Sequence, residues 1–160
     1  LLRLIIKNIL NMGYGYGVWL VYNQKIFAQP TPHIGHITIA CFMKKNDATD
    51  LYNEIIQDVD TTFKVTTDGL PVLFPHNLYE HDKNNLCSWG FNFKYNALPK
   101  LQTISNKYKC DFSYQPHTSI EYAHNASGFK PFCVEKITLN CKVHLVDIRS
   151  DFPNDWNIIQ

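Results

Sequence analysis

The stretch His36-Ile37-Thr38-Ile39-Ala40-Cys41-Phe42 (HITIACF) says most about the fold of this 160-residue chain. Its even-numbered residues, His36, Thr38 and Ala40, alternate with apolar ones. Because successive side chains of a β-strand point to opposite faces, this pattern predicts a strand with one buried face and one polar face. An imidazole and a hydroxyl would then project together from the polar face.

A second stretch, His117-Thr118-Ser119-Ile120, repeats the order histidine, any residue, threonine or serine, apolar residue. Of the seven histidines, only His36 and His117 begin such a motif. The composition of the chain would produce the motif by chance roughly 0.3 times, so two copies are more than chance predicts. Two strands of this kind would hold two imidazoles across a shared cleft.

Paired imidazoles indicate general acid and base catalysis by His36 and His117. A pKa of about 6.5 keeps both protonation states populated near neutrality, so one ring can accept a proton while the other donates one. The hydroxyls of Thr38 and Ser119 would donate hydrogen bonds to the non-bridging oxygens of a phosphodiester. This chemistry requires no metal and no cofactor, and the sequence leaves open which histidine is the base.

The rest of the chain predicts an α+β fold. We expect strands at residues 16–22, 63–67, 86–95, 133–139, 142–148 and 156–159, besides the two motif strands, and an apolar run at residues 70–74. Helices are expected from Asp47, as the N-cap, to Asp58, and over residues 98–108, with a turn at Asp68-Gly69. The order of these elements predicts two antiparallel sheets facing a central cleft with flanking helices. We expect one bilobal domain over residues 12–160, preceded by an N-terminal extension at residues 1–11.

Composition limits the partners. The formal net charge is +1, which argues against a surface that binds long nucleic acid and favours a small nucleotide or a short oligonucleotide. Five scattered cysteines without a C-x-x-C pair are typical of reduced thiols, and we expect a cytoplasmic protein. The apolar start, residues 1–10, has about half the length that a membrane span needs, so we predict no membrane partner and a monomer.

The paired motifs resemble those of the 2H phosphoesterase superfamily, whose members have a bilobal, LigT-like fold. The segment 114–122 (YQPHTSIEY) is similar to the second motif of the cyclic phosphodiesterases of plants and fungi, in which a tyrosine stands five residues after the histidine, as Tyr122 does. Segments containing Trp19 and Trp156 also stand where that branch has similar ones. The resemblance covers about residues 14–160.

The resemblance implies that His36 and His117 are catalytic, that Thr38 and Ser119 bind phosphate, and that Tyr122 lies near the substrate. It implies nucleoside 2′,3′-cyclic phosphates or ADP-ribose cyclic phosphate as substrates, in RNA processing. Other 2H enzymes degrade 2′,5′-oligoadenylates or cyclic oligonucleotide messengers, which would indicate a viral role in immune evasion. Tyr122 lies an odd number of residues from His117, so a regular strand would direct it to the core.

Three alternatives compete with this interpretation. The tetrapeptide His33-Ile34-Gly35-His36 (residues 33–36) spells the HIGH signature of nucleotidyltransferases, in which it opens a helix, whereas a β-branched run follows here. A zinc site with His33 and His36 would need a third ligand and a turn or helix between them. A non-catalytic module could instead bind nucleotide or RNA by stacking bases on Tyr14, Tyr16 or Trp89.

Overall fold

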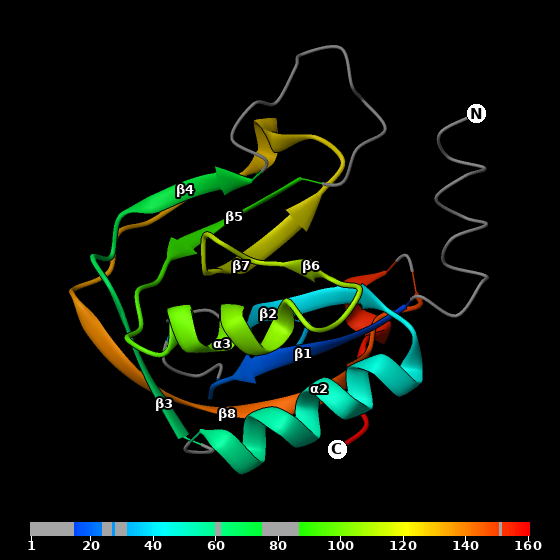
Figure 1. The fold of residues 1–160 in the computed structure, drawn as a ribbon. Helices are drawn as coiled ribbons and strands as arrows, with labels where there is room; N and C mark the ends of the chain where they lie inside the picture. Colours follow the sequence, from blue (N-terminus) through cyan, green and yellow to red (C-terminus); the bar gives the residue numbers. More distant parts are fainter. Residues whose placement is uncertain (1–14, 24–26, 28–31, 60–61, 75–86, 151) are drawn as a thin grey trace.

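The computed structural model describes residues 15–23, 27, 32–59, 62–74, 87–150 and 152–160. The expected extension at residues 1–11 lies outside these ranges, as does the beginning of the expected domain. The described residues form two antiparallel β-sheets and two α-helices (Figure 1). The fold class is therefore α+β, as the sequence predicted.

The larger sheet has the strand order β3-β8-β1-β2-β6, with β9 paired to β8. The smaller sheet has the order β4-β5-β7. The larger sheet contains β1 (Tyr16–Val21), β2 (His36–Met43), β3 (Thr62–Thr67), β6 (Asp111–Phe112), β8 (Ile137–Asp147) and β9 (Asn157–Ile158). The smaller sheet contains β4 (Pro71–Phe74), β5 (Cys87–Asn92) and β7 (His117–Ala123), and the helices are α2 (Lys45–Asp58) and α3 (Leu98–Ser105).

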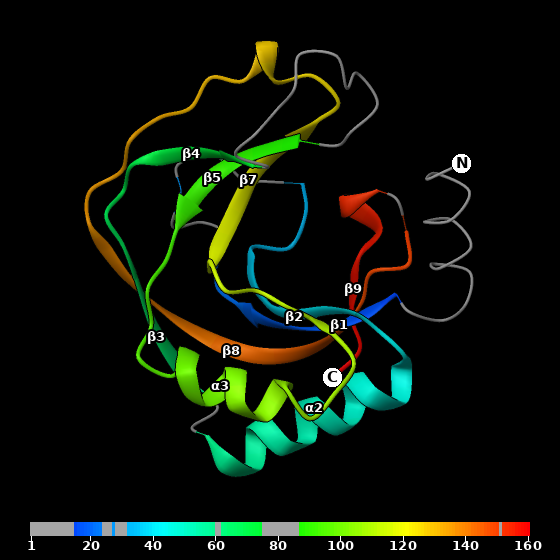
Figure 2. The ribbon, with the colours of Figure 1, turned by 45° about the horizontal axis from the view of Figure 1, so that its top comes forward.

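The three layers are stacked in the order helices, larger sheet, smaller sheet (Figure 2). On the helix side of the larger sheet, Ile37 and Ile39 of β2 are fully buried, as are Leu51 and Ile55 of α2. Burying each such side chain contributes about 1.5–3 kcal/mol to folding. The opposite face of β2 carries the polar residues, so the apolar core holds the motif strand with its histidine directed away from the helices.

Gly69 lies where the chain passes from the larger sheet to the smaller one. Gly69 has a φ of 80°, a conformation that residues with a Cβ rarely adopt. A Cβ at this position would also overlap the carbonyl oxygen of Val134. The Asp68 carboxylate accepts a 3.1 Å hydrogen bond from the Leu70 amide and closes the turn. The predicted turn is confirmed, and it joins strands of different sheets.

Several boundaries differ from the prediction: α3 ends at Ser105 rather than 108, and β5 ends at Asn92 rather than 95. Helix α2 begins at Lys45, so Asp47 lies in its first turn and the N-cap is Lys44. A carboxylate in the first turn interacts favourably with the helix dipole without capping it. The expected strands at 133–139 and 142–148 are one eleven-residue strand, β8, because its buried residues Leu139, Cys141 and Val143 continue the alternation without a break. The two-residue strand β6 was not predicted.

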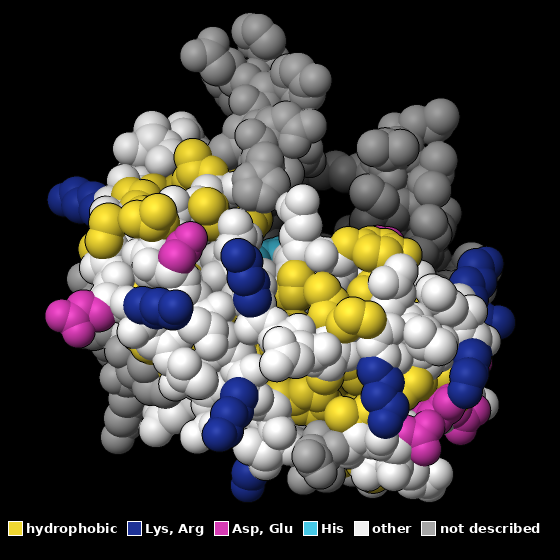
Figure 3. All heavy atoms as spheres, turned by 60° about the vertical axis from the view of Figure 1, so that its left-hand side comes forward, with side chains coloured by type: hydrophobic (Ala, Val, Ile, Leu, Met, Phe, Trp, Pro, Cys, Tyr) yellow, Lys and Arg dark blue, Asp and Glu magenta, His cyan; other side chains and the backbone are white. Residues whose placement is uncertain are grey.

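The surface bears on the predicted partners. No helix within the described ranges is both long and apolar enough to cross a membrane. On the face drawn in Figure 3, the described lysine and arginine side chains are distributed over the surface, and some at its right-hand edge lie beside acidic side chains. This distribution agrees with the small net charge of +1. The expected preference for a short ligand over long nucleic acid remains a prediction.

Candidate active site

The two motif histidines open strands of different sheets. His36 is the first residue of β2 and His117 is the first residue of β7, and these two strands are in contact. Thr38 is paired with Trp19 of β1, which places the two side chains on the same face as His36. The structure therefore brings the two predicted motifs together from positions far apart in the sequence.

His36 is held between two tryptophans. Its ring stacks on that of Trp19 with centroids 3.5 Å apart and planes inclined by 8°, and the ring of Trp156 meets it edge-on at 5.9 Å. Only 7% of His36 is exposed. Its Nδ1 lies 2.7 Å from the carbonyl oxygen of Ile34, which can only accept, so Nδ1 carries the proton and Nε2 is left with a lone pair.

The surroundings of His36 favour the neutral ring. Burial lowers the pKa of His36 from 6.5 to about 3, and the hydrogen bond to Ile34 opposes this shift only in part. Positive charge on His33 or His117 lowers this pKa further. At neutral pH, His36 is therefore uncharged and able to accept a proton.

His117 repeats the local hydrogen bond of His36 in a more open setting. Its Nδ1 lies 2.9 Å from the carbonyl oxygen of Gln115, again two residues before the histidine. Its ring stacks on Phe74 of β4, with centroids 4.0 Å apart and an interplanar angle of 24°. His117 is half-buried, whereas His36 is buried. The two motifs thus present their Nε2 atoms in the same way but in different surroundings.

The two motif hydroxyls also differ. Thr38 is half-buried, and within the described residues its hydroxyl forms no hydrogen bond. Ser119 is buried and its Oγ lies 2.8 Å from that of Ser88 on β5. Burial raises the pKa of the neighbouring Tyr122 hydroxyl, and the Ser119 side chain opposes this shift. Sequence reasoning did not identify Ser88, since no motif includes it.

A β-bulge decides the orientation of Tyr122. In the pairing of β5 with β7, Gly90 lies opposite Ser119. Trp89, which precedes Gly90, lies opposite Glu121 rather than Ile120. Ile120 is therefore an extra residue, and the alternation of β7 reverses beyond it. Tyr122 consequently shares a face with Ser119 instead of turning to the core as a regular strand would require.

Aromatic and hydrogen-bonding contacts join the two sheets around the site. The ring of Trp156 meets Tyr122 at 5.8 Å as well as His36, and it therefore touches residues from both sheets. Tyr22, directly after β1, places its hydroxyl 2.6 Å from Thr118 Oγ1 in β7. These contacts fix the separation of the two motif strands.

His33 also joins the sheets. Its Nε2 donates a 2.9 Å hydrogen bond to the Ser119 carbonyl, and its ring meets Tyr122 at 4.9 Å. The chain is irregular at residues 32–35 and β2 begins at His36, so the helix of a HIGH signature is not formed. Within the described residues, no three histidine, cysteine or acidic side chains are grouped to hold a metal ion, so they provide no third ligand for the zinc alternative.

Two of the three stacking residues named for a binding module are not accessible. Tyr16 is 7% exposed and Trp89 is 2% exposed, so neither offers a ring face to a base. Tyr14 lies outside the described residues. That alternative therefore loses two of its three aromatic contacts.

Comparisons with known proteins found no relative of this chain. No protein-family model, no curated protein and no solved structure matches the chain. The function must therefore be argued from the geometry of the site itself.

Proposed function

We propose that this chain is a metal-independent phosphodiesterase that uses His36 and His117 as a base and acid pair, in a bilobal arrangement like that of the 2H phosphoesterases. The observation that carries the proposal is the matched geometry of the two motifs. Each histidine opens a strand and donates Nδ1–H to the carbonyl two residues earlier, and the strands are in contact. Two imidazoles fixed in the same tautomer on neighbouring strands suit proton transfer at one phosphorus.

The difference in surroundings assigns the roles. His36, kept neutral by burial, takes a proton from water through Nε2 while the water oxygen attacks phosphorus. His117, protonated, gives its Nε2 proton to the leaving oxygen as the phosphorus–oxygen bond breaks. The products are a phosphate monoester and an alcohol. After one turnover His36 is charged and His117 is neutral, so proton exchange with solvent restores the starting state.

The hydroxyls stabilise charge on the non-bridging oxygens. Thr38 can donate directly, because its hydroxyl has no partner among the described residues. Ser88 and Ser119 carry two hydroxyl protons and share one hydrogen bond. One proton of this group is therefore left to donate to phosphate. A preorganised donor of this kind strengthens its hydrogen bond as negative charge develops in the transition state.

The proposal is tested by turnover of a panel of cyclic and linear phosphodiesters with 2′,3′, 2′,5′ and 3′,5′ linkages, in buffer containing a strong chelator. We expect hydrolysis of at least one member, with product positions identified by chromatography. Loss of turnover on chelation would contradict metal independence. Absence of turnover for every member, with tight binding of one of them, would favour a binding module instead.

A further inference from the structure

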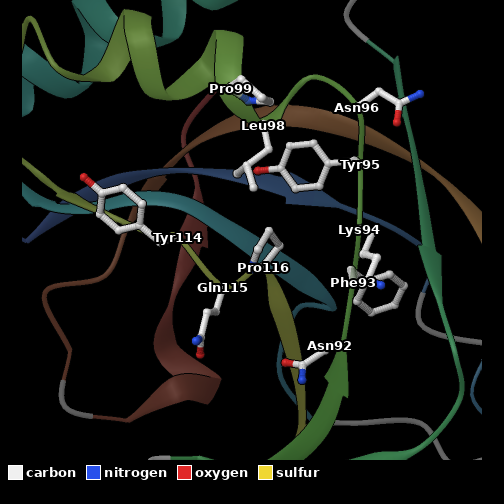
Figure 4. Close-up of a pocket in the computed structure, with 10 residues that line it drawn as sticks. All are labelled: Asn92, Phe93, Lys94, Tyr95, Asn96, Leu98, Pro99, Tyr114, Gln115 and Pro116. Atoms are coloured by element: carbon white, nitrogen blue, oxygen red, sulfur yellow. The ribbon is translucent and has the colours of Figure 1, made fainter.

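A pocket of about 780 Å³ lies next to the beginning of β7 (Figure 4). Its lining includes Gln115 and Pro116, which immediately precede His117. It also includes Asn92, which is paired with His117 across β5 and β7 and so shares its face of the sheet. Because the Gln115 carbonyl accepts the hydrogen bond from His117, the pocket and the proposed acid share part of one wall.

One side of the pocket is formed by residues 92–96, whose Asn92 and Lys94 are polar, whereas Figure 4 shows the amide of Asn96 directed outward. Asn92, Lys94 and Asn96 are exposed, whereas the aromatic residues between them are buried. Lys94 is fixed by two 2.9 Å backbone hydrogen bonds with Thr66. Since alternate residues of an extended segment point to the same side, the amide of Asn92 and the ammonium of Lys94 follow one another away from His117.

The other side of the pocket presents an aromatic ring. Figure 4 shows Tyr114 and Gln115 across the pocket from Asn92 and Lys94. Tyr114 is 63% exposed, and a T-shaped contact with Phe112 at 5.2 Å orients its ring. An accessible ring, amide groups and an ammonium are the groups that bind short single-stranded nucleic acid, by stacking on a base, hydrogen bonding to its edge and pairing with phosphate.

We propose that this pocket binds the leaving nucleotide, and that the substrate is therefore an oligonucleotide in which the cleaved phosphodiester joins two nucleosides. The inference rests on the proposed function, because His117 protonates the leaving oxygen and so places the leaving group on its own side. The base would stack on Tyr114, and Lys94 would bind a further phosphate. A mononucleoside 2′,3′-cyclic phosphate has no leaving nucleotide and would leave the pocket empty.

The test compares dinucleotides of 2′,5′ and 3′,5′ linkage, with and without a terminal phosphate, against adenosine 2′,3′-cyclic phosphate. Tyr114→Ala should lower kcat/KM for the better dinucleotide about tenfold, mainly through KM, since stacking on one base is worth roughly 5- to 150-fold. Turnover of the cyclic mononucleotide should stay within about twofold. Tyr114→Phe keeps the ring and should behave like the unsubstituted chain.

Lys94→Ala should weaken the binding only of dinucleotides that carry the terminal phosphate, so that the KM for these substrates rises severalfold. Lys130→Ala removes the same charge from an exposed lysine that does not line the pocket, and it serves as the matched control. An equal loss on dinucleotide and cyclic mononucleotide, or no loss with Tyr114→Ala, would overturn the inference while leaving the proposed function in place.

Binding measurements separate the inference from the chemistry. Fluorescence anisotropy of a labelled dinucleotide requires no turnover. If no substrate is hydrolysed, the proposed function fails. Weaker binding in Tyr114→Ala but not in Tyr114→Phe would then still support the nucleotide pocket, whereas equal affinity in all variants would remove it.

Discussion

The two histidine motifs share a local geometry and differ in what packs on them. In both, Nδ1 is bonded to the carbonyl two residues earlier, so both rings have the same tautomer. His36 lies against Trp19 and Trp156 and is buried, whereas His117 lies against Phe74 and is half-buried. The comparison teaches that the strand motif sets tautomer and direction, while the packing of distant aromatic residues sets the charge.

The largest expected effect comes from removing either ring. His36→Ala and His117→Ala should each lower kcat by ~10²–10⁴-fold, because each removes one proton transfer that the other cannot replace. Steady-state kinetics on the best substrate measures this loss, and circular dichroism verifies the fold. His124→Ala, at an exposed histidine after β7, is the matched control and should keep full activity. Retained activity in either motif variant would end the assignment.

The buried state of His36 makes stability depend on pH. Its pKa falls from 6.5 to about 3 on folding, so between these values the unfolded chain binds more protons than the folded one. The free energy of unfolding therefore loses nothing to His36 above pH 6.5. It decreases as the pH falls towards 3, by up to about 1.4 kcal/mol per pH unit. Urea unfolding at pH 7.5, 5.5 and 4.5 measures the slope.

His36→Gln should flatten that slope, and the difference from the unsubstituted chain isolates His36. This subtraction is needed because burial also lowers the pKa of His33, which acts in the same direction. His124→Gln should retain the original slope. An unchanged slope in His36→Gln would show that the ring of His36 is accessible to solvent in the folded state.

The two motif hydroxyls should differ in their importance. Thr38→Val removes a hydroxyl that has no partner among the described residues, and we expect a loss of ~10²-fold in kcat. Ser119→Ala should lower kcat only about tenfold, because Ser88 and Tyr122 keep hydroxyls beside the vacated position. Kinetics of both variants on one substrate measures the difference. Equal losses of kcat in the two variants would mean that the hydroxyls of Ser88 and Tyr122 cannot substitute for that of Ser119.

The smallest expected effect tests the bond between the sheets. Tyr22→Phe removes the phenol that is hydrogen-bonded to Thr118 and should destabilise the chain by ~1 kcal/mol. Thr118→Val removes the other partner, and a double-mutant cycle isolates the coupling of the pair. Denaturant unfolding measures the stability of the unsubstituted chain, the two single variants and the double variant. A coupling near zero would show that the contact contributes nothing to holding the sheets together.

Much of the fold could be predicted because strand periodicity is local. The alternation of residues 36–42 and the spacing of apolar residues in α2 each depend only on neighbours in the chain. The start of α2 was missed because Lys44 caps it through backbone conformation without a side-chain hydrogen bond. Strand β6 was missed because two residues, Asp111 and Phe112, carry no periodic signal.

The candidate site was predicted in its motifs and missed in its supports. Tyr22 and His33 reach the site through contacts between the sheets, and Ser88 reaches it from the neighbouring strand of the smaller sheet. No spacing in the sequence predicts such contacts. The orientation of Tyr122 depends on a bulge at Ile120, which is a property of the pairing of two strands rather than of either strand alone. Tyr122 reaches the face of Ser119 for that reason.

The sequence by itself determined the α+β class, the two histidine strands and the hydroxyl that accompanies each ring, because side-chain alternation follows from covalent geometry. Only the tertiary structure decided that Trp19 and Trp156 enclose His36, that burial lowers its pKa, and that a pocket adjoins His117. Burial and electrostatic coupling act through space, so they depend on which segments the fold brings together, and local sequence does not encode them.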